Sequence, residues 1–242
     1  MPEFVRLGAV GADEIGTVHR DLLDPPVHAA RPHVALNFVM TADGRVSYDG
    51  RAEIGTRTDR ELMFRLRSLA GAVMIGAGTL RVDPFAPSTK GRAQQPVAVV
   101  VSRSCELPLK NRFFAHPGER LVATTNRAAP AAVAAARAAG ATVETFGDVE
   151  VDLARLLAAL RDRWRVGFLL CEGGPTLAGE LLAQRLVDEL FLTHATLITA
   201  EPDARRLFEG SLRPAGAVRL ERVSLHESAD GERYERSRIR YR

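Results

Sequence analysis

The sequence predicts an α/β fold whose central sheet is mostly parallel. Apolar, β-branched runs of strand length alternate with helical patterns through most of the 242 residues. Strands separated by helices pair in parallel, and the helices then cover both faces of the sheet. The C-terminal part differs, because two segments of alternating polarity are joined by "ADG". This pattern predicts an antiparallel hairpin at one edge of the sheet.

Each element follows from its own pattern. Apolar runs of strand length predict strands, whereas longer segments with a 3.6-residue apolar period predict helices. The expected strands are 33–40, 72–77, 96–102, 120–125, 142–146, a run from 166 that ends at Cys171 or Glu172, a long strand over 188–199, and the hairpin segments 217–228 and 233–242. The expected helices are 56–70, 129–140, 152–164 and 175–187.

The first expected helix has the clearest start signal. Thr58 and Glu61 have the spacing of a capping box, and Leu62, Leu66 and Leu69 share one face. Arg67 lies on the opposite side of the helix, which is typical of a side chain that leaves the core. Taken by itself, the pattern favours a solvated surface arginine at this position.

Composition excludes several classes of protein. The formal charge is only +3 and arginine is spread along the chain, so we expect no nucleic-acid partner. The two cysteines are far apart and indicate reduced thiols in a cytoplasmic protein. We see no signal peptide and no apolar run of the ~20 residues that span a bilayer, so we expect no membrane association. Residues 1–32 are the least patterned part and are interpreted as an extension to a single domain over 33–242.

Motif spacing excludes further chemistries. The six histidines form no H-E-x-x-H, and the zinc deaminase pattern is absent, so we expect no metal. Neither a phosphate-binding G-x-x-x-x-G-K-[ST] loop nor a G-x-S-x-G nucleophile elbow occurs. Phosphoryl transfer by a P-loop and α/β-hydrolase chemistry are therefore not expected.

Two strands end in glycine-containing turns. In "VMIGAGTLRVDP" (73–84), Gly76 and Gly78 match the start of a dinucleotide fingerprint, but Arg81 replaces its third glycine. A degraded fingerprint, a plain strand–turn–helix and a different nucleotide site all remain open.

The second turn is "LLCEGGPTLAGELL" (169–182), in which Pro175 occupies a first helical position. Backbone amides at such a helix start attract anions, and glycine lets a phosphate approach. An anion cradle and a tight structural turn are equally compatible with this pattern. Glu172 shifts the balance a little toward the anion cradle. A charged residue at the end of an apolar strand costs free energy to bury unless it serves a site or has a partner.

Three motifs in order resemble the pyrimidine reductase family of riboflavin biosynthesis. They are "TADGRV" (41–46), "LRSLAGAVMIGAGTLRVDP" (66–84) and "LLCEGGPTLAGELL" followed by "LVDEL" (186–190). Family members are the C-terminal domain of a bifunctional deaminase/reductase or its stand-alone counterpart. The resemblance implies a three-layer, dihydrofolate-reductase-like fold, a homodimer, and NADPH-dependent reduction of a phosphoribosylamino-pyrimidine to its ribityl form.

The resemblance also implies roles for individual residues. Arg67, Glu172 and Lys90 match the substrate side, with Lys90 near the substrate phosphate. Glu172 and Asp83 are the candidates for positioning or delivering a proton. The cofactor side comprises Met40 at the nicotinamide end, Thr79 and Asp83, Ser102 and Arg103 at the 2′-phosphate, and Gly173, Gly174, Pro175, Thr176 and Leu177 at the pyrophosphate. A solvated loop arginine is an equally good interpretation of Arg103.

The chain departs from the family pattern at three places. Asn37 stands where family members often carry lysine, Pro84 directly follows Asp83, and the segment around Glu53 lacks the usual small or aromatic residues. These departures lie on the substrate side. The 5-amino-6-(5-phosphoribosylamino)uracil reductase activity is therefore weighed against reduction of a 2,5-diamino-pyrimidinone phosphate or of dihydrofolate or another pterin, and against a non-catalytic NADPH-binding regulator.

Overall fold

The computed structural model describes residues 25–26, 28–51, 54–89, 94–209 and 217–241. In this part of the chain, nine strands form one sheet in the order β5-β4-β3-β2-β6-β1-β7-β9-β8. The strands from β5 to β7 in this order pair in parallel, and β9 and β8 add antiparallel. Both expectations for the sheet are confirmed. The strands are β1 (His33–Met40), β2 (Ala72–Gly76), β3 (Val97–Val101), β4 (Arg120–Thr124), β5 (Thr142–Thr145), β6 (Phe168–Cys171), β7 (Glu189–His194), β8 (Arg219–Glu227) and β9 (Arg233–Arg240).

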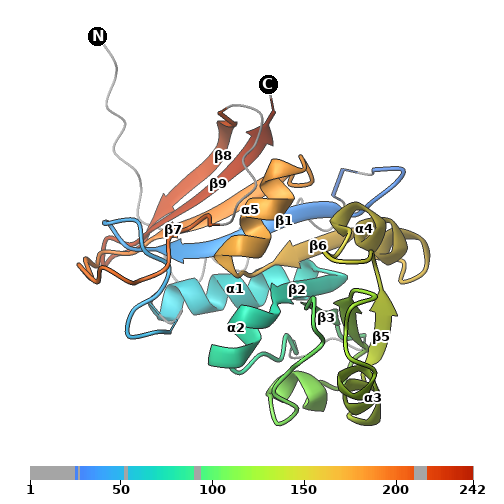
Figure 1. Ribbon diagram of the computed structural model, residues 1–242. Coiled ribbons are helices and arrows are strands. Elements are labelled where there is room, and N and C mark those ends of the chain that lie inside the picture. The colour runs from blue at the N-terminus through green and yellow to red at the C-terminus, as the bar shows by residue number, and fades with distance from the viewer. Residues whose placement is uncertain (1–24, 27, 52–53, 90–93, 210–216, 242) are drawn as a thin grey trace.

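Helices cover both faces of the sheet and make the three layers that were expected (Figure 1). Neighbouring residues of β1 show the two faces, because Leu36 belongs to the core under α4 and α5 whereas Ala35 belongs to the core under α1, α2 and α3. This alternation is the two-residue period of a strand buried on both sides. The helices are α1 (Arg57–Leu69), α2 (Ala77–Val82), α3 (Pro130–Ala138), α4 (Leu153–Asp162) and α5 (Pro175–Ala183), with a 3₁₀ turn at Arg112–Ala115.

The expected capping box of α1 is wrong. The N-cap is Thr56, so Thr58 lies inside the helix, and Glu61 binds Arg57 at 2.9 Å instead of closing a box. The hydroxyl of Thr56 does not cap the helix but donates to Glu232, which is fully buried in the turn between β8 and β9. A tertiary contact therefore fixes where this helix begins.

One further element differs from the expectation. β7 ends at His194, and the remaining residues of the expected long strand leave the sheet, so that Leu197 and Ile198 are 39% and 69% exposed. The carbonyl of Leu197 instead accepts a hydrogen bond from the amide of Ala42 at 2.8 Å. The six-residue helix α2 follows β2 directly, which agrees with the strand–turn–helix that the sequence left open for residues 73–84.

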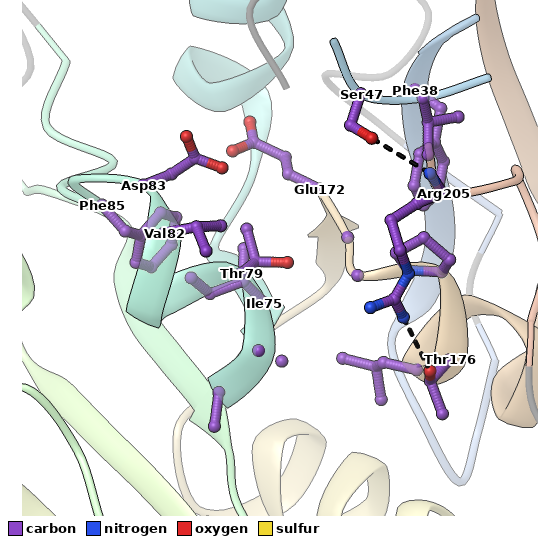
Figure 2. Close-up of a pocket in the computed structure, with 18 of the residues that line it drawn as sticks. Phe38, Ser47, Ile75, Thr79, Val82, Asp83, Phe85, Glu172, Thr176 and Arg205 are labelled. Carbon is purple, nitrogen blue, oxygen red and sulfur yellow. Dashed lines mark hydrogen bonds between the residues drawn. The ribbon is translucent and has the colours of Figure 1, made fainter. Parts of the chain in front are cut away.

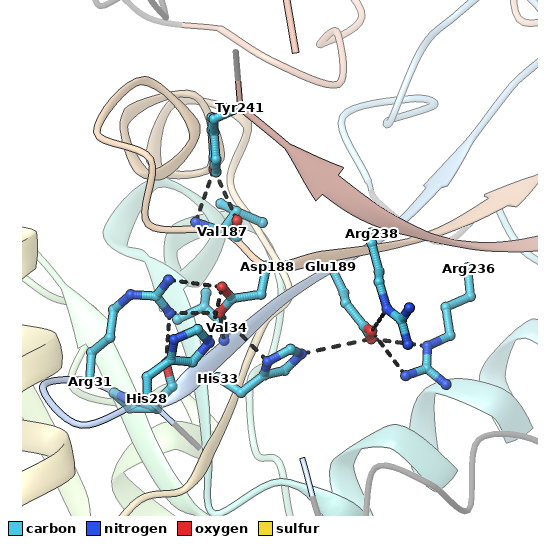
Figure 3. A network of polar contacts seen from close by, with 11 residues as sticks. His28, Arg31, His33, Val34, Val187, Asp188, Glu189, Arg236, Arg238 and Tyr241 are labelled. Carbon is cyan, nitrogen blue, oxygen red and sulfur yellow. Dashed lines mark hydrogen bonds and ion pairs between the residues drawn. The ribbon is translucent and has the colours of Figure 1, made fainter. Parts of the chain in front are cut away.

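Charged side chains link the N-terminal ends of β1 and β7 with β9 (Figure 3). Asp188 accepts two hydrogen bonds from Arg31, at 2.6 and 2.8 Å, and Glu189 accepts two from the buried Arg236, at 2.9 and 3.0 Å. His33 lies between the two carboxylates, 3.7 and 3.8 Å from their oxygens. His28, His33 and Asp188 are close enough to share a metal ion, but Arg31 already supplies a cation to this carboxylate.

Among the helices of the described residues, none has the length and apolar character that a membrane crossing requires.

Candidate active site

A cleft of about 1590 Å³ lies at the carboxyl ends of β1, β2, β3 and β6 (Figure 2). Ligands of open α/β sheets bind at this end of the strands. Helix α1 contributes one wall, whereas α2 and the start of α5 contribute another. The segment 73–84 forms a strand, a turn and a helix, and Gly76, Gly78 and Thr79 line the cleft.

The turn after β6 needs glycine for two different reasons, backbone conformation at Gly173 and a close side-chain neighbour at Gly174. Gly173 has a φ of +123°, a conformation that L-residues rarely adopt, and its peptide bond to Gly174 is cis. A Cβ on Gly174 would lie 2.9 Å from the Thr79 hydroxyl oxygen. The amide of Gly76 donates to the carbonyl of Gly173 at 2.9 Å, which holds this turn against the end of β2.

Helix α5 begins at this turn with Pro175 as its first residue. Gly174 is its N-cap and supplies no side-chain bond to the helix amides. The first residues of α5 line the cleft, so the positive end of the helix dipole lies at it, which suits an anion. Arg205 extends over the same place, with a guanidinium nitrogen 3.5 Å from the hydroxyl oxygen of Thr176 (Figure 2). Sequence reasoning missed Arg205, because a single arginine in a polar loop carries no signal.

Arg67 and Glu172 meet in the cleft although 105 residues separate them. Two nitrogens of Arg67 donate to the two carboxylate oxygens of Glu172, both at 2.7 Å. The side chains are only 12% and 8% exposed, so the solvated surface arginine is excluded. Burial lowers the pKa of Arg67, but the Glu172 carboxylate outweighs this effect and the pKa is raised overall.

Asp59 in α1 adds a second carboxyl group to the cleft beside Glu172, and sequence reasoning missed it. Burial and the nearby carboxylates of Glu232 and Glu172 raise the pKa of Asp59 to about 6, against a lowering contribution from a hydrogen bond with Thr193. An aspartate in the first turn of a helix normally complements the helix dipole, so its position gave no hint of a site. Asp83 ends α2, and its carboxylate also points into the cleft (Figure 2).

The end of β3 places Ser102 and Arg103 on the cleft. Ser102 is buried, and its hydroxyl accepts a hydrogen bond from the amide of Cys105 at 3.1 Å. Arg103 pairs with Glu150 at 2.8 Å, with the two side chains 70% and 61% exposed. The exposed guanidinium can exchange this partner for another anion at little cost.

The structure gathers most of the expected site residues. Arg67, Thr79, Asp83, Ser102, Arg103, Glu172 and the run Gly173 to Leu177 line one cleft, and Asn37 lines it where the family often has lysine. Met40 is not among the described residues of the lining and packs against the core instead. Lys90 and Glu53 lie outside the described residues.

Comparison with known proteins agrees with this geometry. Residues 32–232 match the RibD C-terminal domain. The 2,5-diamino-6-ribosylamino-4(3H)-pyrimidinone 5′-phosphate reductase of Archaeoglobus fulgidus is 30% identical over 208 residues, which cover 80% of this chain and 94% of the relative. Its counterpart in Methanothermobacter thermautotrophicus is 34% identical over 198 residues, 79% of this chain and 91% of the relative.

A solved structure shows the same fold. The pyrimidine reductase-like protein of Corynebacterium diphtheriae superimposes with a TM-score of 0.81 at 23% identity, covering 96% of this chain and all of the other. The family match over most of the chain and the similarity to full-length relatives agree with each other. The chain therefore belongs to the RibD C-terminal domain family of riboflavin-pathway reductases.

Proposed function

We propose that the protein uses NADPH to reduce the ribosyl group of a phosphoribosylamino-pyrimidine to ribityl. The observation that carries the proposal is the joining of two sites in one cleft, an anion-binding helix start at α5 and the buried pair of Arg67 and Glu172. The names of the relatives favour the 2,5-diamino-pyrimidinone phosphate over the uracil as substrate.

The cleft fits a dinucleotide on observations of its own. Gly173 and Gly174 have no side chains that would cover the start of α5, so a pyrophosphate has access to the amides of Thr176 and Leu177. Arg205 adds a positive charge at this place, and Arg103 provides a fork-shaped donor set for a 2′-phosphate. The reduced nicotinamide, when bound, supplies the hydride.

The substrate side is formed by α1 and the residues after β6. The pairing of Arg67 with Glu172 holds both side chains in one orientation, so that hydrogen-bonding groups are fixed before a substrate arrives. Phe38 and Phe85 give apolar surface for a flat ring in the same cleft. The protein thus binds and orients a phosphorylated pyrimidine next to the cofactor.

The direct experiment follows the loss of NADPH absorbance with three candidate substrates. We expect turnover of 2,5-diamino-6-ribosylamino-4(3H)-pyrimidinone 5′-phosphate and slower or no turnover of 5-amino-6-(5-phosphoribosylamino)uracil and of dihydrofolate. Dihydrofolate is included because Asp59 places a carboxyl in the first helix facing the cleft, as a pterin reductase needs. Reduction of dihydrofolate alone would reject the riboflavin assignment, and NADPH binding without any turnover would favour the regulator.

Arg103→Ala tests the preference for NADPH over NADH. We expect the KM for NADPH to rise by about tenfold or more, since a charge-assisted contact contributes roughly 1–3 kcal/mol, while the KM for NADH stays the same. Steady-state kinetics with both cofactors measure the effect. Arg163→Ala is the matched control, because Arg163 pairs with Glu144 on the surface and does not line the cleft in the described residues. Equal losses for both cofactors in Arg103→Ala would remove the 2′-phosphate role.

A homodimer and a cytoplasmic location are also part of the proposal. The first half of β8, at the edge of the sheet, is exposed on both faces, including Leu220 and Val223. An edge strand of this kind is suited to cover a second copy of the chain. Sedimentation equilibrium tests the dimer, and a monomer at micromolar concentration would contradict it. Cys105 and Cys171 are free and buried, as expected for a reducing compartment.

A further inference from the structure

Reduction of a ribosyl group consumes a proton as well as a hydride, and the present inference rests on the proposed function. The hydride forms a new C–H bond at C1′, and the bond between C1′ and the ring oxygen breaks. The ring oxygen takes one proton and becomes a hydroxyl group, while the reduced nicotinamide is oxidised. A group in the cleft must therefore hold a proton at the pH of the reaction and be able to give it away.

Glu172 is unsuited to this task. Each of its carboxylate oxygens accepts a hydrogen bond from Arg67 at 2.7 Å, and the pair is buried. A proton on either oxygen would displace one of these two charge-assisted bonds and leave the guanidinium short of a partner. The geometry gives Glu172 the role of a fixed anion that orients Arg67.

Asp59 has the opposite surroundings. It lies in the first turn of α1 and lines the same cleft as Glu172, but no arginine forms an ion pair with it in the described residues. The groups that act on it are Glu232 from the β8–β9 turn, Glu172 after β6, the Thr193 hydroxyl of β7, and Arg60 on its own helix. Partial burial and two neighbouring carboxylates disfavour the charged form of Asp59, and Arg60 is the one cation that opposes them among the described residues, so the surroundings favour a neutral carboxyl group.

We propose that Asp59 is the proton donor of this reductase. It lines the same cleft as Arg67 and Glu172, and burial together with two neighbouring carboxylates raises its pKa to about 6. Carboxyl groups that act as general acids near neutral pH are prepared in this way. Glu172 supports this role from a distance, because its fixed negative charge disfavours ionisation of Asp59.

The direction of the pH dependence follows from the acid role. Only protonated Asp59 can give a proton, so kcat is expected to be level below about pH 6 and to fall up to tenfold per pH unit above it. Asp59→Asn retains the shape but has no proton to give. We expect kcat of this variant to fall by about a hundredfold or more and to lose its dependence on pH near 6, while NADPH affinity stays unchanged.

Two control variants separate this role from its alternatives. Glu61→Gln changes an exposed carboxyl of the same helix, which pairs with Arg57, and should keep the wild-type rate and profile. Asp83→Asn tests the other carboxyl of the cleft, and it should lower kcat without removing the pH dependence near 6. A flat profile in Asp83→Asn with a wild-type profile in Asp59→Asn would transfer the role to Asp83 and overturn the proposal.

A measurement on the wild-type enzyme makes the test independent of folding of the variant. Single-turnover rates of NADPH oxidation with the diaminopyrimidinone substrate are recorded between pH 4.5 and pH 8. A midpoint near pH 6 supports Asp59, and a rate that is constant over this range overturns the proposal while leaving the proposed function in place. If the wild-type enzyme reduces neither pyrimidine, the proposed function fails and this inference fails with it.

Discussion

Arg67→Ala is expected to destabilise the fold and to disable the substrate side of the cleft at once. Removal of one partner from a buried ion pair leaves the other charge without compensation, and such changes reduce the free energy of unfolding by about 3–5 kcal/mol. Glu172 would be that stranded charge, since its side chain is only 8% exposed. Urea unfolding measures the loss, and steady-state kinetics should show a strongly raised KM for the substrate with NADPH binding kept.

The same helix provides a control. Arg57 forms an i, i+4 pair with Glu61 at 2.9 Å, but its side chain is 87% exposed. Arg57→Ala should change the free energy of unfolding by no more than about 0.5 kcal/mol, because water screens surface pairs of this kind. If both variants lost the same stability, the distinction between the buried and the exposed pair would be refuted.

A second variant should remove cofactor binding. Gly174→Val places a branched side chain 2.9 Å from the Thr79 hydroxyl oxygen, at the start of α5 where the pyrophosphate is proposed to bind. The φ of Gly174 is −79°, which any residue adopts, so the effect is steric and the backbone requirement belongs to Gly173. We expect the affinity for NADPH to fall by about a hundredfold or more, equivalent to roughly 2.7 kcal/mol, in isothermal titration of the folded variant.

Combining this change with Thr79→Ala separates two explanations of the loss. The double variant gives the new side chain room, so a loss caused only by the collision with Thr79 would be restored. We expect no restoration, because the valine still occupies the approach of the anion to the helix amides. Unchanged affinity in Gly174→Val itself would leave the glycine turn as a purely structural feature.

The sheet was predictable because strands buried on both faces are continuous apolar runs whatever surrounds them. The start of α1 was not, since the partner of Thr56 is Glu232, 176 residues away. Arg67 looked like a surface residue for a related reason, because its helix pattern contains no trace of Glu172. Family motifs put both residues at one site, but only the structure shows that they bind each other.

Asp59 illustrates a different limit of sequence reasoning. Its neighbours come from β7, from the turn after β6 and from the β8–β9 turn, and none of these is near it in sequence. The pKa of a carboxyl group depends on the combined effect of burial, hydrogen bonds and nearby charges. The residue pattern within one helix therefore cannot predict the pKa of Asp59.

The start of α1 is held by Glu232, a residue that is synthesised near the end of the chain. The ribosome releases α1 long before the turn between β8 and β9 exists, and N-terminal parts of a chain begin to fold first. Until that turn arrives, Thr56 lacks its buried partner and the helix that carries Asp59 and Arg67 has no anchor at its start. The parallel strands can thus pair during synthesis before the wall of the cleft formed by α1 has its contact with Glu232. A chain that ends before this turn lacks the contact that holds the start of α1, and with it the support of the cleft wall that carries Asp59 and Arg67.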